Sequence, residues 1–278
     1  MRVTRTSNGL KVHAVTGTYV VSLGLHMPQA DCAGLLGFSI HRTDHTENEA
    51  AYLQGMKAFA ETDPGFPAGS QYSTGDHPIQ SFQWADYSAK PGHDYTYRIT
   101  ARKGTPTALV SHAEVSVRIQ TESPEGGDHN VYFNRGVAAS QEYVRRFGNR
   151  SPDQVQNDQA YIWLSRGLYE ALDEFIASTD PERETLRVAA YEFTYEPFLA
   201  LLKDALDRGV DMRISYDGRE KGKDKAPGLI NRTRAAAAGL TGVSVERTRP
   251  KSPISHNKFI VKSRDGQPVS VWTGGTNF

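Results

Sequence analysis

A histidine and a lysine stand two positions apart near the C-terminal end of the 278-residue chain, as His256 and Lys258. If residues 256–262 form a strand, side chains two positions apart project from the same face, so both polar groups can reach one ligand. Phe259 and Val261 are then expected on the opposite, buried face. An imidazole can act as nucleophile or as general acid, and an ammonium binds an anion.

A second polar segment, Gly-Gly-Thr-Asn at residues 274–277, follows the next expected strand. Glycine lets the backbone approach an anion closely, and an asparagine amide adds a donor. A nucleophilic base, a cation and an amide around one anion match the needs of phosphoryl transfer. The catalytic candidates are therefore His256, Lys258 and Asn277, and the substrate-binding candidates are Gly275 and Thr276.

The elements that must position these residues differ between the two halves of the chain. Residues 1–121 mostly alternate apolar and polar side chains, which is typical of strands with one buried face. The polar residues 122–128 include a proline and a glycine pair, which predicts a linker. Residues 129–278 alternate helix and strand patterns, which predicts a mostly parallel sheet flanked by helices. The expected domains are therefore residues 1–121 and 129–278.

Periodicity also predicts individual elements. Expected strands of the first half lie at 19–25, 36–42, 81–87, 95–101 and 114–119, with a short helix considered within 47–62. In the second half, helices are expected at 134–147, 158–178, from Pro197 to Gly209, and at 226–239. Strands are expected there at 186–193, 210–216, 243–247, 256–262 and 268–273.

The combination of His-x-Lys with Gly-Gly-x-Asn on the following strand resembles the catalytic motif of the phospholipase D superfamily. Ser263 stands where that motif usually has Asp, and Asp265 follows two positions later. The resemblance implies that His256 attacks phosphorus or protonates the leaving oxygen, while Lys258 and Asn277 bind the other phosphoryl oxygens. It also implies a reaction without metal or cofactor. Ser263 puts the orientation of the site in doubt.

Residues 90–101 resemble the penultimate strand of a fibronectin type III domain. The resemblance implies a β-sandwich in which the Tyr95 hydroxyl fastens a loop. Trp84 is expected in its core, and a carbohydrate platform of Trp84, Tyr87 and Tyr97 is the functional alternative. The expected fold class is therefore an all-β, fibronectin type III-like sandwich followed by an α/β phospholipase D-like lobe.

Members of the phospholipase D superfamily build one site from two such motifs, whereas this chain contains a single His-x-Lys. The resemblance therefore implies a partner that supplies the second motif, either another polypeptide or a homodimer mate. Because the sequence stops at Phe278, directly after the motif, a missing complementary segment is the favoured expectation. The isolated half is expected to be inactive. A catalytically inactive adaptor or binding protein is the alternative function.

Composition and charge say less about the substrate and the cellular location than the motifs say about the chemistry. The chain is formally neutral, with 32 basic and 32 acidic residues, so bulk charge predicts no partner. Lys221, Lys223 and Lys225 follow Arg219 in one expected loop, which favours nucleic acid over phospholipid as the phosphodiester substrate. The single cysteine and the lack of a long apolar stretch predict a cytoplasmic chain without a transmembrane segment. The histidines of residues 1–121, including His93, show no metal-ligand spacing.

Overall fold

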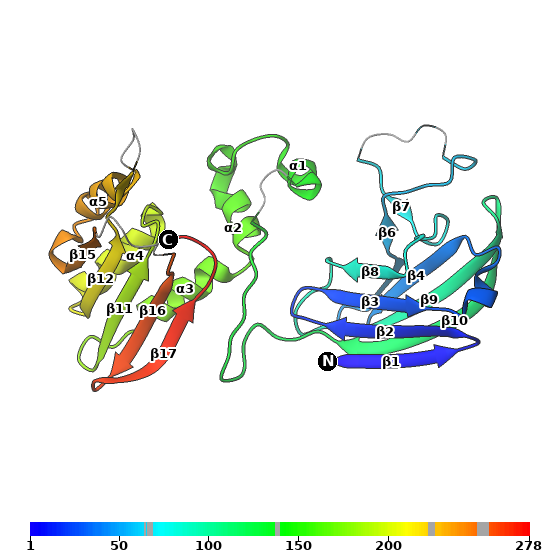
Figure 1. Cartoon of the computed structure of the whole chain (residues 1–278), viewed down its shortest axis with the longest axis horizontal. Helices are drawn as coiled ribbons and strands as arrows, with labels where there is room; N and C mark the ends of the chain where they lie inside the picture. Colours follow the sequence, from blue (N-terminus) through cyan, green and yellow to red (C-terminus); the bar gives the residue numbers. More distant parts are fainter. Residues whose placement is uncertain (64, 66–68, 137–139, 222–225, 249–255) are drawn as a thin grey trace. The chain divides into compact units, whose positions relative to one another are not determined.

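The computed structural model describes residues 1–63, 65, 69–136, 140–221, 226–248 and 256–278. The chain divides into two compact units, Met1–Leu164 and Ser165–Phe278 (Figure 1). Residues 129–164 thus lie in the first unit, although the sequence groups them with the following residues. The linker at 122–128 and the domains on either side of it stay a prediction.

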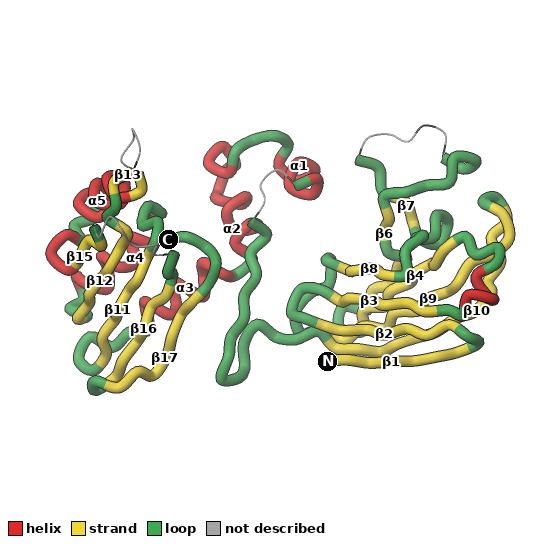
Figure 2. The backbone as a smooth tube through the Cα atoms, in the orientation of Figure 1, coloured by secondary structure: helices red, strands yellow, loops and turns green. Residues whose placement is uncertain are grey.

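The first unit contains two four-stranded antiparallel sheets (Figure 2). One has the order β1-β2-β3-β8, with β1 Arg2–Ser7, β2 Leu10–Thr16, β3 Val21–His26 and β8 Gln83–Asp86. The other has the order β10-β9-β4-β5, with β10 Ala108–Gln120, β9 Asp94–Thr105, β4 Gly37–Asp44 and β5 Glu49–Tyr52. Alternate apolar residues of both sheets meet in one core, as the period of two requires.

The insertion after β4 forms strands, so the helix considered for 47–62 is wrong. β5 follows β4 through a tight turn, and β6 Gln54–Gly55 pairs with β7 Tyr72–Ser73. A side chain at the turn explains the difference, because Asp44 Oδ1 accepts the backbone N–H groups of Thr46 and Glu47. Such local bonds favour a turn over a helix. A short 3-10 helix, η1 Gln29–Cys32, precedes β4.

The buried tyrosine of β9 behaves as expected. Tyr95 is fully buried, and its hydroxyl accepts the backbone N–H of Lys90 at 2.9 Å, which fastens the loop before the strand. The carbohydrate platform is not supported, because Tyr97 is fully buried and its hydroxyl donates to Asp86. Tyr87, by contrast, is 74% exposed. The rings therefore do not share one exposed face.

Short helices end the first unit. They are α1 Gln141–Phe147, η2 Pro152–Gln154, η3 Gln156–Asp158 and α2 Gln159–Ser165, the last residue of which begins the second unit. The helix expected at 134–147 starts only at 141, where the Ser140 hydroxyl caps it by accepting the Tyr143 N–H. The helix expected at 158–178 is broken, because Arg166 and Gly167 adopt positive φ angles of 52° and 84°.

The second unit is built on a five-stranded mixed sheet of order β15-β12-β11-β16-β17. Its strands are β11 Glu184–Ala190, β12 Asp211–Asp217, β15 Ser244–Arg247, β16 Phe259–Arg264 and β17 Gln267–Thr273. The pairings of β11 with β12 and β12 with β15 are the only parallel ones among the described strands. β16 pairs with β11 and β17 in antiparallel fashion.

The helices of this unit are α3 Leu168–Ala177, α4 Glu196–Asp207, α5 Gly228–Ala237 and the 3-10 helix η4 Thr241–Val243. A two-stranded ribbon, β13 Glu220–Lys221 with β14 Ala226–Pro227, precedes α5. No helix within the described part of the chain is long and apolar enough to cross a membrane.

The core of the second unit lies on one face of the sheet. Leu186, Val188 and Ile260 point into it and share it with apolar residues of α3, α4 and α5. On the opposite face of the sheet, Val245 of β15 and Val271 of β17 are 63% and 60% exposed. The sheet is therefore not flanked by helices on both faces.

The predicted fold class is wrong for both halves. In the second unit only two pairings among the described strands are parallel, so the mostly parallel α/β description does not hold there. The first unit includes α1 and most of α2 as well as its sheets, so an all-β, fibronectin type III-like description does not hold for it either. The reason in the second unit is the β16–β17 hairpin. A hairpin adds two strands without a crossover helix, so the helical cover that parallel connections bring is missing there.

Candidate functional site

His256 lies in the stretch directly before β16, which begins at Phe259, so the expected strand at 256–262 starts three residues late. The His256 side chain is exposed rather than directed into an apolar core. Its ring contacts the Tyr191 ring edge-on, with centroids 4.8 Å apart and planes at 65°. The imidazole is thus held from one side and open to solvent, as a nucleophile or proton donor requires.

Lys258 is 4% exposed, and it shares the buried face with Ile260 and Lys262. The expected arrangement is thus inverted, because Phe259 and Val261 are the partly exposed residues. The Lys258 Nζ donates to the His256 carbonyl at 3.2 Å and lies 5.6 Å from the centroid of the Tyr191 ring. A carbonyl and a ring face offer a buried ammonium partial compensation for the lost water.

Burial lowers the pKa of Lys258, and the nearby Glu192 carboxylate opposes this shift in part. The ammonium therefore loses hydration, and within the described residues its hydrogen bond goes to a carbonyl and not to a carboxylate. A group in this state gains much from an incoming anion.

Asn277 reaches the same place from β17. The segment before it is tied to Lys258, whose carbonyl accepts the Thr273 hydroxyl at 3.2 Å and the Gly274 N–H at 3.4 Å. The Asn277 side-chain amide donates to the Glu192 carboxylate. Both ends of the segment are therefore anchored, and the amide donor is held beside the Tyr191–Glu192 turn.

Phe278 fixes the residue after the asparagine. Its ring stacks on Phe198 of α4 with centroids 4.4 Å apart, and its carbonyl accepts the Thr194 N–H at 2.8 Å. Figure 1 shows this chain end beside the end of β11. Gly275 and Thr276, the substrate-binding candidates, are exposed, and a Cβ added at Gly275 would meet no atom within 4 Å. Space for a ligand lies next to the backbone there.

The turn that gathers these residues follows β11, and sequence reasoning missed it. Tyr191 touches His256 and Lys258, and Glu192 holds Asn277. The side chain of Asn231 in α5 holds this turn by hydrogen bonds to its backbone. This asparagine is fully buried. It stands one helical turn before the buried Ala235, so a polar residue on the apolar face of the helix was the sequence signal that could have revealed it.

The basic loop expected to favour nucleic acid loses part of its support. Arg219 is 4% exposed and forms a buried ion pair with Asp217, with Nε at 2.8 Å from Oδ1. Burial would raise the pKa of Asp217, but the hydrogen bonds from Arg219 outweigh it and lower that pKa. Lys223 and Lys225 lie outside the described residues, as does the Lys221 side chain.

The residues at and near the missing motif Asp lie away from the site. Ser263 is near the far end of β16, and Asp265 occupies the turn between β16 and β17 with φ 49°. Asp265 is ion-paired with Arg183, and that bond lowers the pKa of Asp265 despite some opposing desolvation. Asp265 lies seven positions after Lys258 along extended chain, a span of roughly 20 Å. Asp265 does not replace the motif carboxylate.

A second cluster lies in the first unit, where ligand-type atoms of Asp44, Glu47 and His93 fall within 4.8 Å of one another. The sequence spacing did not reveal it. Each group has a protein partner, because Asp44 accepts from His93 at 2.8 Å and Glu47 pairs with Lys90. Burial would raise the pKa of Asp44, but bonds from His93 and two backbone N–H groups lower it. The cluster serves to hold the β4–β5 turn.

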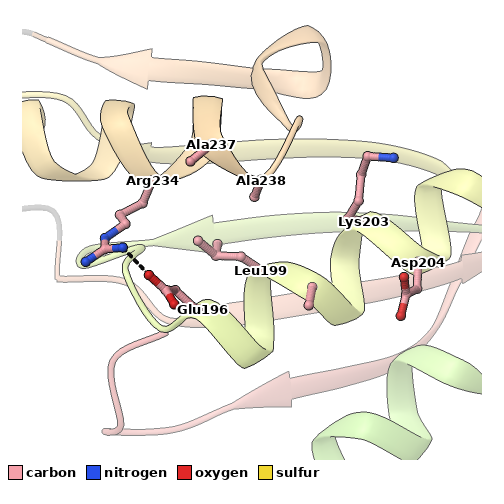
Figure 3. A pocket seen from close by; sticks show the side chains of 8 residues that line it. Glu196, Leu199, Lys203, Asp204, Arg234, Ala237 and Ala238 are labelled. Carbon is pink, nitrogen blue, oxygen red and sulfur yellow. Dashed lines mark hydrogen bonds and ion pairs between the residues drawn. The ribbon is translucent and has the colours of Figure 1, made fainter.

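A cavity of about 330 Å³ lies between α4 and α5 (Figure 3). Leu199, Ala237 and Ala238 form its apolar wall, and Glu196 bonds to Arg234 across one end, as the dashed line shows. Lys203 at the other end is paired with Asp207. Three of the charged groups at this cavity are thus paired within the protein, and none of the motif residues lines it.

No protein-family model and no curated protein matches the chain. Among solved structures, it is similar to the crystal structure of Nuc, a phospholipase D family member from Salmonella typhimurium. The two are 30% identical with a TM-score of 0.30, over 40% of this chain and 64% of Nuc. The chain thus spans 64% of the length of that structure. A TM-score this low does not establish a common fold. The functional proposal therefore rests on the geometry of the site.

Proposed function

We propose that the second unit carries one half-site of a phosphodiesterase of the phospholipase D superfamily. The observation that carries the proposal is the buried Lys258 ammonium next to an exposed His256 and the Asn277 amide, all around the Tyr191–Glu192 turn. A desolvated cation, an amide donor and an accessible imidazole are the groups that bind and attack a phosphodiester.

In this reaction, a His256 ring nitrogen attacks phosphorus and the bond to the leaving oxygen breaks. The leaving oxygen takes a proton from a second acid, and the phosphohistidine is later hydrolysed by water. Lys258 and Asn277 stabilise the charge on the non-bridging oxygens. The open space at Gly275 accommodates the phosphoryl group, with Thr276 beside it.

A second motif completes this mechanism. One imidazole does not serve as attached nucleophile and proton donor in the same step, so another acid must stand opposite. We propose that a second polypeptide or a second copy of this chain supplies it. Phospholipids and nucleic acids remain the two substrate classes, and the ion-paired Arg219 removes one argument for nucleic acid.

The proposal is tested with bis(p-nitrophenyl) phosphate over a range of protein concentrations, with rapid denaturation at alkaline pH to trap a phosphohistidine, whose P–N bond is labile in acid. We expect His256→Ala to abolish the trapped species and to lower turnover by about 10³-fold or more. The control is His112→Ala, which removes an exposed histidine from β10 of the first unit. EDTA should leave turnover intact, because imidazole is the nucleophile.

An inactive anion-binding adaptor is the second candidate, favoured by Ser263 at the motif Asp position. It predicts phosphate binding that depends on Lys258 without turnover at any protein concentration. Turnover that persists in His256→Ala, or that EDTA removes and a divalent metal restores, would contradict the phosphohistidine mechanism.

A further inference from the structure

We infer that the Glu192 carboxylate is an internal ligand of the anion site, which makes the site select singly charged phosphodiesters over doubly charged phosphate. This inference rests on the proposed function, because it concerns the same Lys258 and Asn277 groups. It assigns a role to a residue that lies outside the His-x-Lys and Gly-Gly-x-Asn segments.

The carboxylate occupies the donor that a phosphoryl oxygen would use. The Asn277 side-chain amide donates to Glu192, and the remaining face of the Asn277 segment is exposed. Glu192 also acts on Lys258 through its charge, while the Lys258 ammonium itself donates to the His256 carbonyl. An oxygen anion therefore already stands among the groups that are to bind the substrate anion.

Buried bonds hold Glu192 in this position. The Asn231 side chain accepts the Phe193 N–H at 2.9 Å and donates to the Tyr191 carbonyl at 2.8 Å, so it grips the backbone on both sides of Glu192. The same amide donates to the Asp217 carbonyl at 2.9 Å. With its donors and acceptor all engaged and no exposed surface, Asn231 fixes where the turn lies.

The turn is also tied to the chain end that carries the amide. Thr194, two residues after Glu192, donates its N–H to the Phe278 carbonyl, and Phe278 follows Asn277 directly. The two partners of the Glu192–Asn277 bond are therefore linked through the backbone as well. A surface carboxylate that merely swings onto a free amide has no such support.

Charge gives the consequence for the substrate. A fixed carboxylate repels every bound anion, and the repulsion doubles when the ligand carries two charges. A phosphodiester has one negative charge near neutral pH, whereas inorganic phosphate and phosphomonoesters carry up to two. Glu192 is thus a specificity-determining residue that disfavours products and analogues ending in a free phosphate.

Two variants separate charge from position. Glu192→Gln keeps a carbonyl oxygen that accepts the Asn277 amide, but it removes the charge. Glu192→Ala removes both. Glu182→Gln, at an exposed position of the same unit, is the matched control for loss of one charge. Lys258→Met tests whether the anion site exists at all, and melting temperatures verify that each variant is folded.

The experiment is isothermal titration calorimetry at pH 8 with inorganic phosphate, which is mainly a dianion there, and with diethyl phosphate, a monoanion. We expect Glu192→Gln to tighten diethyl phosphate binding by about fivefold and phosphate binding by about twenty-five-fold. Glu182→Gln should change neither, and Glu192→Ala should gain less than Glu192→Gln because Asn277 loses its anchor.

The outcomes distinguish the two levels of the proposal. If Lys258→Met abolishes binding while Glu192→Gln leaves the phosphate-to-diester ratio unchanged, the role of Glu192 is wrong and the anion site stands. If Lys258→Met leaves binding of both anions unchanged in a folded protein, the anion site is wrong, and the proposed function falls with it.

Discussion

At the scale of single residues, the site is defined by a lysine in an unusual place. Lys258 is buried, with 4% of its surface exposed. Its ammonium lies next to a carbonyl and an aromatic ring and, within the described part of the chain, not at hydrogen-bonding distance from a carboxylate. Lys262, four residues later in β16, is also buried. Its ammonium lies 4.6 Å from the Phe175 ring centroid and donates a hydrogen bond to the Ser178 hydroxyl. The difference is that Lys258 lies beside His256 and the open Gly275 segment.

The titration of Lys258 gives a testable limit on the alkaline side. Because burial lowers its pKa below the usual 10.5, the ammonium loses its proton at a lower pH than an exposed lysine does. Binding of diethyl phosphate, whose charge is constant, should therefore weaken as pH rises towards 10.5. Lys258→Arg should extend binding to higher pH, since a guanidinium stays charged.

Calorimetric titrations between pH 7 and 11 measure this limit, with the exposed Lys57→Arg as control. The same shift affects stability. Between the folded-state pKa and 10.5 the unfolded chain binds more protons, so the free energy of unfolding rises with pH in that window. An alkaline limit that is identical in the wild type and Lys258→Arg would show that Lys258 does not carry the anion.

At the scale of elements, the site depends on a turn between β11 and α4 that a helix holds in place. Asn231 of α5 bonds to the Tyr191 carbonyl, the Phe193 N–H and the Asp217 carbonyl, and so joins the ends of β11 and β12 to the helix. Parallel strands end at the same edge of a sheet, which is why one side chain reaches both. The Asp217–Arg219 pair adds a second buried link there.

Removal of the Asn231 side chain should lower the stability of the protein and disturb the geometry of the site. Asn231→Ala leaves one backbone N–H and two backbone carbonyls without their side-chain partner, and we expect it to lower the free energy of unfolding by roughly 2–4 kcal/mol. Urea denaturation followed by far-UV circular dichroism measures the change. Thr233→Ala, two residues later on the exposed side of α5, is the control and should change stability by less than about 0.5 kcal/mol.

An Asn231→Ala variant as stable as the wild type would mean that water or a local shift satisfies the turn. Diethyl phosphate affinity should fall in the same variant at temperatures where it is folded, because Glu192 and Asn277 lose their common support.

At the scale of the whole molecule, the second unit presents one sheet face with exposed apolar residues, among them Val245, Val269 and Val271. The helices of the unit contribute to the core on the opposite face. The proposed mechanism also needs an acid that the described half-site lacks. Both the packing and the chemistry are thus compatible with a site completed by another chain.

We expect turnover of bis(p-nitrophenyl) phosphate by the purified chain to follow its association. Specific activity should rise with protein concentration in parallel with the dimer fraction from size-exclusion chromatography with light scattering, and it should be negligible for the monomer. A monomer that turns over the diester at enzymatic rates would refute the need for a second motif. A stable dimer without turnover would indicate that a different polypeptide supplies it.

Local features of the chain could be predicted from its residue pattern. Strand periodicity located β3, β4, β8, β9 and β10 in the first unit and all five strands of the sheet in the second, because alternate burial leaves its period in the residue types. It missed β1, β2 and the short strands β5, β6, β7, β13 and β14. The role of Tyr95 as a loop fastener and the candidate residues His256, Lys258 and Asn277 also came from the sequence. Their catalytic roles stay a prediction, although the structure brings the three around one turn.

How those features combine depends on contacts between residues that are far apart in the chain. Strand direction, and with it the mixed sheet with one covered face, depends on the pairing of β11 with β16, whose partners lie about 70 to 80 residues apart in the chain. The site likewise depends on Glu192 and Asn231, whose residue types are ordinary and whose partners are distant in sequence. Local patterns record which face of an element is buried, but long-range pairing and charge placement leave no period in the sequence, and these set the fold and the site.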